Sequence, residues 1–363
     1  MNGSNPSLTV VVLAFAIGAV FGALAQRTRF CTMGAIADIV TLGDWRRMRM
    51  WLLAIGIAVI GSSALHASGQ IDLGQSIYRT PSFAWLSYLL GGLSFGFGMV
   101  LASGCGARTL VRLGGGSLKA LVVVLVLGIV ALITLRGIIG VFRVRVLESM
   151  TLHLTAGQDL PALLGGFGVS PHGALAVSVL LFGGGALFLA GRGRERLPVD
   201  QKLGGLLIGL LVVLGWYVSG HLGYLAEDPE TLQEAFVATN SGRMESLTFV
   251  APAAYTLEWL MWGSDSSRTI TFGIASGIGV IVGSACQALL AGTFRWEGFS
   301  SLEDTVNHLL GAALMGFGGV LAMGCTVGQG ISGLSTLSLG SLLTFLAIIG
   351  GARLALAYQY RRA

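Results

Sequence analysis

Three of the four cysteines in this sequence lie in similar surroundings, and their thiols could take part in binding. Cys31, Cys105 and Cys325 each follow a long apolar run and stand among glycines, in RFCTMG, ASGCGA and AMGCTVG. A helix break there frees backbone N–H groups and directs the positive end of a new short helix toward the gap, which favours an anion. A neutral thiol adds a weak hydrogen-bond donor and a polarizable sulfur. The combination predicts a site for a small anion, in particular one that contains sulfur.

Residues next to these cysteines are expected to complete the anion site. Glycine lets the backbone come close to a ligand, and free amide groups follow each break. The expected supporting residues are Gly34, Gly104, Gly106, Gly324, Thr326 and Gly328. Most of the other glycines among the 56 in the chain have a simpler explanation, which is close approach between helices.

Other chemistry finds little support in the sequence. Cys286, in GSACQALLAG, has no glycine break beside it and is expected to be structural. The chain has no C-x-x-C pair and its five histidines are scattered, so no metal site is predicted. GGGSLK does not match the phosphate-binding loop G-x-x-x-x-G-K-[ST], and no dinucleotide fingerprint appears. We therefore expect no cofactor, no catalytic residues and no enzyme activity.

Two of the cysteine stretches are copies of each other. Residues 89–106 and 309–326 align at a constant offset of 220, and 11 of the 18 positions are identical. The second copy is four residues longer between its cysteine and the GS-L that follows. The helix that contains the first copy is expected to run opposite to the helix that contains the second. Such inverted repeats are typical of transporters, whose substrate sites lie near the membrane midplane where the repeats meet.

The composition places the chain in a membrane. It has 363 residues, of which 54% are hydrophobic and only 11% charged, whereas soluble domains have about 25% charged residues. The mean hydropathy is +0.79. A helix needs roughly 20 apolar residues to span a bilayer, and nine stretches qualify. They are 8–26, 48–66, 83–103, 117–137, 172–190, 203–221, 269–291, 305–323 and 339–358. The predicted fold is an all-α membrane protein with about nine transmembrane helices and short re-entrant or broken helices.

The placement of basic residues predicts the orientation. With the N-terminus in the periplasm and the C-terminus in the cytoplasm, 16 of the 22 Lys and Arg residues fall on the cytoplasmic side. We expect a single transport domain, 1–363, with repeat halves at about 1–140 and 203–363 joined by 141–202. The acidic segment 222–268 is then external, with no assigned role. The net charge of +5 reflects this topology, and nothing indicates a nucleic acid partner.

The three cysteine motifs resemble those of the YeeE/YedE family of bacterial inner-membrane proteins, whose characterised members take up thiosulfate. The stretches that carry the resemblance are QRTRFCTMG, GFGMVLASGCGARTLVRL and GFGGVLAMGCTVGQGISGLSTLSLGS. The resemblance implies a pseudo-symmetric, hourglass-like helical bundle, with Cys31, Cys105 and Cys325 as a relay for thiosulfate through S–H···S hydrogen bonds. It also implies a cytoplasmic TusA-like sulfurtransferase as partner. Segment 222–268 matches no motif of the family.

Three alternatives to a thiosulfate carrier stay open at this point. The first is transport of another sulfur or selenium compound. The second is a membrane sulfur acceptor in which one cysteine forms a persulfide, which would need an activated thiolate. Arg29 and Arg108 are close in sequence to Cys31 and Cys105. The third is transport of a soft metal such as Cu(I).

Overall fold

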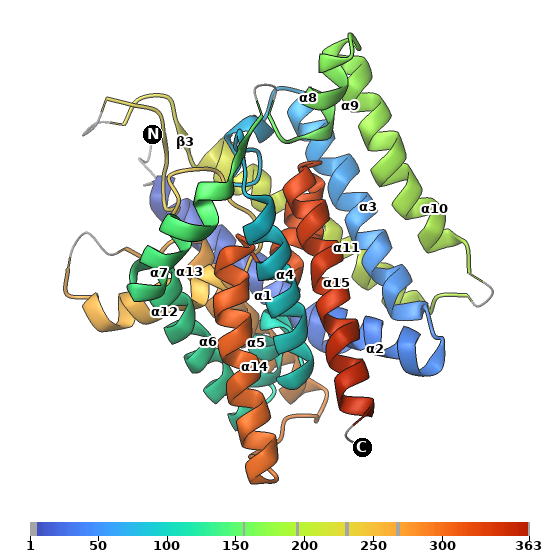
Figure 1. The fold of residues 1–363 in the computed structure, drawn as a ribbon, viewed down its shortest axis with the longest axis vertical. Helices are drawn as coiled ribbons and strands as arrows, with labels where there is room; N and C mark the ends of the chain where they lie inside the picture. Colours follow the sequence, from blue (N-terminus) through green and yellow to red (C-terminus); the bar gives the residue numbers. More distant parts are fainter. Residues whose placement is uncertain (1–5, 155–156, 194–195, 229–231, 266–268, 362–363) are drawn as a thin grey trace.

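The computed structural model describes the chain except for residues 1–5, 155–156, 194–195, 229–231, 266–268 and 362–363. The described chain folds into a bundle of long helices, with short helices between them (Figure 1). The long helices are α1 (Pro6–Thr28), α3 (Arg46–Ala67), α4 (Trp85–Leu101), α6 (Leu118–Arg136), α11 (Val199–Tyr217), α13 (Phe272–Leu290), α14 (Leu302–Leu321) and α15 (Leu339–Tyr360). The prediction of an all-α membrane protein is confirmed.

Shorter elements connect the long helices. The short helices are α2 (Thr32–Leu42), α5 (Gly106–Gly114), α7 (Ile138–Phe142), α8 (Leu160–Gly166), α9 (Pro171–Val179), α10 (Gly185–Gly191) and α12 (Ala251–Trp262). Four π-helical turns span Arg143–Leu147, Leu180–Gly184, Val218–Leu222 and Gly328–Gly333, and two 3₁₀ turns span Leu73–Gln75 and Glu148–Met150. Two antiparallel pairs of two-residue strands complete the described fold: β1 (Ser82–Phe83) with β2 (Leu152–His153), and β3 (Tyr224–Leu225) with β4 (Ala235–Phe236).

Eight helical segments in the described part of the chain are long and apolar enough to cross a membrane. The remaining predicted span, 305–323, is also helical and forms most of α14. Its first turns include Glu303, Asp304 and His308, which lower its average hydropathy. Ser301 caps the N-terminus of this helix, because its Oγ accepts a hydrogen bond from the Asp304 backbone N–H at 3.1 Å. It packs against both α4 and α6.

The two copies of the repeated stretch form α4 and α14, which cross in opposite directions. A Cβ on Gly91 would lie 2.8 Å from the Gly318 oxygen, and a Cβ on Gly98 would lie 2.6 Å from the Gly311 oxygen. At the offset of 220, Gly91 corresponds to Gly311 and Gly98 corresponds to Gly318. The contact of Gly91 with Gly318 is therefore repeated, with the two copies exchanged, by the contact of Gly311 with Gly98. A two-fold axis between the copies requires such a pair of contacts. Without these glycines the two backbones could not approach so closely.

The same relation extends to the surrounding helices. Helix α4 packs on α15, which follows the second copy, and α14 packs on α6, which follows the first. In the same way α1 packs on α13, and α11 packs on α3. The packing thus relates the helices before residue 140 to those after α10. Between them, α9 and α10 lie along the outer side of α3 (Figure 1).

The segment 222–268 is only partly at the surface. Strands β3 and β4 belong to a loop region at one end of the bundle, at the upper left of Figure 1. Residues 244–250 are all buried, and the chain continues as α12, which packs on α6. The backbone of this segment therefore enters the protein interior, although the sequence analysis treated the whole segment as external.

Candidate functional site

The three cysteine motifs share one backbone turn. In each, the residue two positions before the cysteine has a positive φ angle: 53° at Arg29, 56° at Ser103 and 55° at Met323. Such a conformation costs a non-glycine residue roughly 1–2 kcal/mol. The N–H of the next residue bonds back into the preceding helix: Phe30 to Ala25, Gly104 to Met99 and Gly324 to Gly319. The chain thus builds the same helix-ending turn three times, directly before each thiol.

Each cysteine then stands at the start of a new helical turn. The Cys31 Sγ accepts a hydrogen bond from the Gly34 N–H, and the Cys325 Sγ accepts one from the Gly328 N–H, both at 3.4 Å. Cys105 precedes α5 in an extended conformation without such a bond. The amides of Gly34 and Gly328 thus point to the thiols of these two cysteines. The sulfur atoms lie where helix starts concentrate positive potential.

The three thiols converge in the interior. Cys31, Cys105 and Cys325 are 6%, 1% and 0% exposed. The Cys31 and Cys105 side chains lie next to each other, and Cys325 lies close enough to Cys105 to interact electrostatically. Segments about 70 and 220 residues apart in sequence are thereby brought together. Cys286, in contrast, is exposed on α13.

Thr326 and Arg108 connect the thiols to their surroundings. Thr326 follows Cys325 in the chain, yet its side chain lies beside the thiol of Cys105. Arg108, on α5, is near both Cys31 and Cys105. Its Nη1 atom is buried and has no hydrogen-bond partner among the residues described. An anion in contact with these thiols would therefore meet one unsatisfied guanidinium donor.

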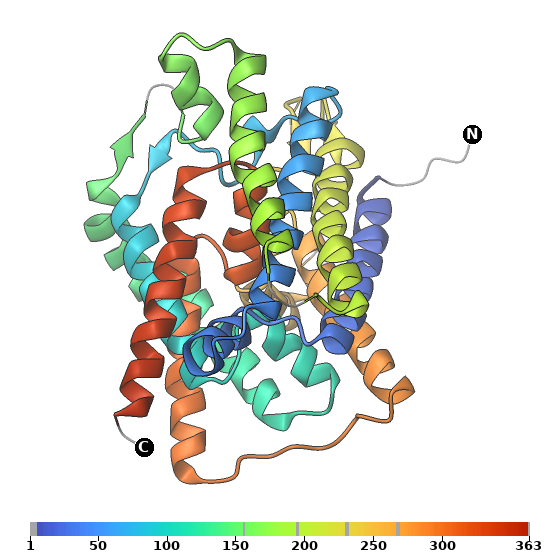
Figure 2. The same ribbon diagram turned by 90° about the vertical axis from the view of Figure 1, so that its right-hand side faces the viewer.

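Beyond Arg108 the site opens into a basic pocket of about 510 Å³. We call this pocket the vestibule. Its arginines are Arg27, Arg29, Arg108, Arg112 and Arg295, and its acidic residue is Glu297. Glu297 lies 3.7 Å from the Arg112 guanidinium and 3.7 Å from the Lys119 ammonium, so it offsets part of this charge. The loop between α13 and α14, which carries Arg295, runs along the bottom of the molecule in Figure 2. Such a mouth raises the local concentration of anions.

On the side of Cys325, two hydroxyl groups replace the arginines. Tyr78 and Thr248 are buried, and both lie near the thiol of Cys325. A Cβ on Gly328 would lie 2.5 Å from the Thr248 Oγ1 and 3.3 Å from the Tyr78 Oη, so only glycine leaves room for both. The sequence analysis identified neither residue.

Thr248 directly precedes a stretch that corresponds to the first cysteine motif but lacks its cysteine. Helix α2 begins directly after Phe30-Cys31, and α12 begins directly after Phe249-Val250. Helix α2 packs on α15 and α12 packs on α6, the two helices that follow the repeated copies. The stretch FVAPAAY is therefore the counterpart of FCTMGAI, with valine in place of the cysteine. Aligning these two stretches could have located the helix start at α12. The valine removes the thiol that marks the breaks at Cys31, Cys105 and Cys325.

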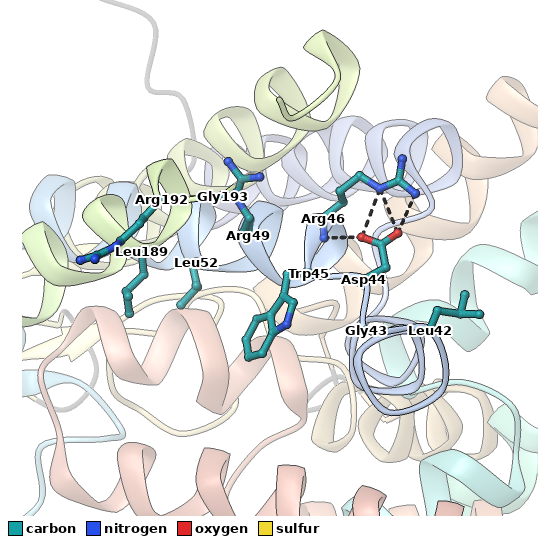
Figure 3. Close-up of a pocket in the computed structure, with 10 residues that line it drawn as sticks. All are labelled: Leu42, Gly43, Asp44, Trp45, Arg46, Arg49, Leu52, Leu189, Arg192 and Gly193. Atoms are coloured by element: carbon teal, nitrogen blue, oxygen red, sulfur yellow. Dashed lines mark hydrogen bonds and ion pairs between the residues drawn. The ribbon is translucent and has the colours of Figure 1, made fainter. Parts of the chain in front are cut away.

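A separate pocket of about 730 Å³ lies between the start of α3 and the end of α10 (Figure 3). At its edge the Arg46 guanidinium binds Asp44, with Nη2–Oδ2 at 2.7 Å, and this contact lowers the pKa of the Asp44 carboxyl. Trp45 is 56% exposed beside it. This pocket is lined by none of the predicted site residues. Among the described residues, no group of three His, Cys, Asp or Glu side chains is placed to hold a metal ion.

This chain is similar to known proteins over most of its length. The family model described as "Sulphur transport" matches residues 27–354, a range that includes all three buried cysteines. The chain is 27% identical to the thiosulfate transporter TsuA of Escherichia coli over 345 residues, which are 89% of this chain and 87% of that protein. It is 26% identical to a thiosulfate transporter TsuA of Spirochaeta thermophila over 349 residues, covering 92% and 94%. A shorter match, 35% over 95 residues, joins 26% of this chain to 21% of the probable transporter YedE of Escherichia coli.

Proposed function

Because the chain belongs to the sulphur transport family, we propose that it takes up thiosulfate across the bacterial inner membrane. The observation that carries the proposal is the convergence of Cys31, Cys105 and Cys325 in the protein interior, beside a vestibule rich in arginine. Two relatives that align over about nine-tenths of the chain are named thiosulfate transporters. The proposed role is that of a carrier and not of an enzyme.

The arrangement supports a relay without a covalent step. Thiosulfate presents a soft terminal sulfur, which accepts weak hydrogen bonds from neutral thiols. In this proposal the anion meets Cys325 first, passes to Cys105 and then to Cys31, and leaves through the vestibule past Arg108. Each contact is weak, and several sites follow one another, which lets an ion enter and also leave. The breaks supply irregular backbone only where it is enclosed by protein.

The proposed orientation places the N-terminus in the periplasm and the C-terminus in the cytoplasm. The vestibule then opens to the cytoplasm, together with the first turns of α3 and α14. Its positive charge holds the anion close to the exit, where a TusA-like sulfurtransferase is the proposed acceptor. Anionic lipid headgroups would meet the arginines at the rim of the same face.

One observation favours a second candidate, a sulfur acceptor. The guanidinium of Arg108 lies near both Cys31 and Cys105, and a cation beside a thiol favours the thiolate. A thiolate could attack the terminal sulfur of thiosulfate, form a cysteine persulfide and release sulfite. Other sulfur or selenium anions of similar size are alternative cargoes for the same path.

Uptake of ³⁵S-thiosulfate into proteoliposomes, with and without an imposed proton gradient, tests the proposed function. We expect uptake above that of protein-free liposomes, and competition by unlabelled thiosulfate stronger than by sulfate. A protein that is folded and inserted but gives no uptake under either condition would contradict the proposal.

The charge of the vestibule leads to a salt-dependent prediction. Replacing Arg295 by glutamine should lower the initial uptake rate about two- to fivefold at low ionic strength when the vestibule faces the thiosulfate solution. The effect should fade near 1 M salt, where the Debye length is about 3 Å. Arg353→Gln is the matched control, because Arg353 is exposed on α15 and does not line the pocket. Equal losses for both variants, or a loss that salt leaves unchanged, would contradict steering by the vestibule.

A further inference from the structure

Three buried hydroxyl groups, those of Tyr78, Thr248 and Thr326, lie beside the thiols. Thr326 is 0% exposed, Tyr78 is 3% exposed and Thr248 is 8% exposed. The side-chain oxygen of each is buried, without a hydrogen-bond partner in the described residues. Buried polar groups in proteins are hydrogen-bonded in the great majority of cases, and an unsatisfied one is unfavourable. Three such groups at one site need an explanation.

A nearby threonine shows what a structural hydroxyl looks like in the same place. Thr109 is one turn after Cys105, is 3% exposed, and donates its hydroxyl hydrogen to the Cys105 carbonyl oxygen at 3.0 Å. This bond to the preceding turn is the usual way for a threonine to satisfy its hydroxyl within a helix. Thr326 is equally buried and also lies beside Cys105, but it makes no such bond in the described structure.

Each of these three hydroxyls lies next to one of the thiols. Thr326 lies beside Cys105, and Thr248 and Tyr78 lie beside Cys325, above the bare Cα of Gly328. Gly328 is also the residue whose N–H points to the Cys325 sulfur. Two of the cysteines thus have an oxygen donor next to the sulfur donor.

The pseudo-symmetry indicates where the oxygen donors are concentrated. On the vestibule side, Cys31 and Cys105 form a pair of thiols. On the opposite side the counterpart of Cys31 is Val250, so Cys325 has no thiol in the equivalent place. Thr248, two residues before Val250, supplies a hydroxyl there, and Tyr78 adds another. The outer half of the path therefore offers one thiol and two hydroxyls.

We propose that Tyr78, Thr248 and Thr326 form an oxygen-recognition ladder that binds the sulfonate end of the cargo while the thiols bind its terminal sulfur. This inference rests on the proposed function and specifies how the cargo is selected. Hydroxyl groups are harder and stronger hydrogen-bond donors than thiols, and they suit sulfonate oxygens. An anion with both a sulfur end and an oxygen end satisfies the two sets together. An anion without oxygen leaves the buried hydroxyls unpaired, as in sites that reject an analogue lacking one polar group.

The test uses Tyr78→Phe, Thr248→Val and Thr326→Val, each of which removes one hydroxyl with little change in shape. The measurements are the KM for ³⁵S-thiosulfate uptake into proteoliposomes and the inhibition constant of thiocyanate, a sulfur anion without oxygen. We expect each variant to raise the KM for thiosulfate at least about tenfold, while the inhibition constant of thiocyanate changes less than twofold. Thr248→Ser and Thr326→Ser, which keep the hydroxyl, should restore most of the affinity.

Thr109→Val is the matched control and should leave both constants unchanged, because the Thr109 hydroxyl is already satisfied by its own helix. Unchanged KM values in all three variants would contradict the oxygen-recognition ladder and leave the proposed function standing. A joint rise of the thiosulfate and thiocyanate constants would also contradict it, because that result indicates a disturbed path and not a lost oxygen contact. A wild-type protein that takes up no thiosulfate would contradict the proposed function itself, and this inference with it.

Discussion

Replacing Cys325 by alanine is expected to reduce the initial rate of thiosulfate uptake at least about tenfold. The Cys325 thiol is fully buried and lies between the hydroxyls of Tyr78 and Thr248 and the pair formed by Cys31 and Cys105. Without this thiol the anion must cross the gap between its neighbouring sites without a partner, and a barrier higher by about 1.4 kcal/mol lowers the rate about tenfold. Cys31→Ala and Cys105→Ala are expected to lower uptake in the same way.

The control for this series is Cys286→Ala, which should transport at the wild-type rate because Cys286 is exposed on α13. Insertion and thermal stability should be measured for every variant, so that a lost contact is distinguished from a lost fold. Truncation of a buried side chain as small as cysteine leaves only a small cavity, so the variants should remain folded. Full transport by the triple alanine variant would show that the thiols are not the path.

The second large effect concerns the fold and is expected at Gly283. A Cβ at this position would lie 1.8 Å from the Ala19 carbonyl oxygen, where α13 packs on α1. Gly283→Ala must therefore push the two helices apart, and overpacking of this kind typically costs about 1–3 kcal/mol or more. We expect a clearly lower apparent Tm in detergent and a lower yield of folded protein.

Gly277 provides a matched control on the same helix. A Cβ there would meet nothing within 4 Å apart from its chain neighbours and the nearby backbone of its own helix. Gly277→Ala should be neutral or stabilising, because alanine is favoured over glycine in a helix by about 1 kcal/mol. Equal Tm values for the two variants would contradict the close contact between α1 and α13.

Much of the fold could be predicted from local sequence signals. Long apolar runs mark the helices, and the order of the predicted spans indicated that α4 and α14, which carry the repeated stretch, run in opposite directions. Their packing through Gly91, Gly98, Gly311 and Gly318 has the reciprocity of a two-fold relation. The cysteine motifs could be recognised because a thiol within an apolar glycine-rich stretch is a distinctive signal. That these thiols converge is a tertiary property, and the sequence could only lead us to expect it.

The missed features have physical reasons of their own. The turns before the cysteines place the left-handed conformation at Arg29, Ser103 and Met323, and the two glycines that follow Ser103 and Met323 do not adopt it. Tyr78 and Thr248 lie in connecting segments without a repeated motif, and their hydroxyls reach the site only through folding. The role of segment 222–268 was hidden because Val250 stands where the other half has Cys31.

The central claim is that intact thiosulfate passes along the three thiols without a covalent step. The most direct measurement compares uptake of thiosulfate labelled with ³⁵S at the terminal sulfur with uptake of thiosulfate labelled at the sulfonate sulfur, in the same proteoliposomes. The account predicts equal rates for both labels, loss of both in the triple alanine variant, and no change in the intact mass of the protein. Retention of the terminal label on the protein with release of labelled sulfite from the other sample would contradict it and establish a persulfide instead.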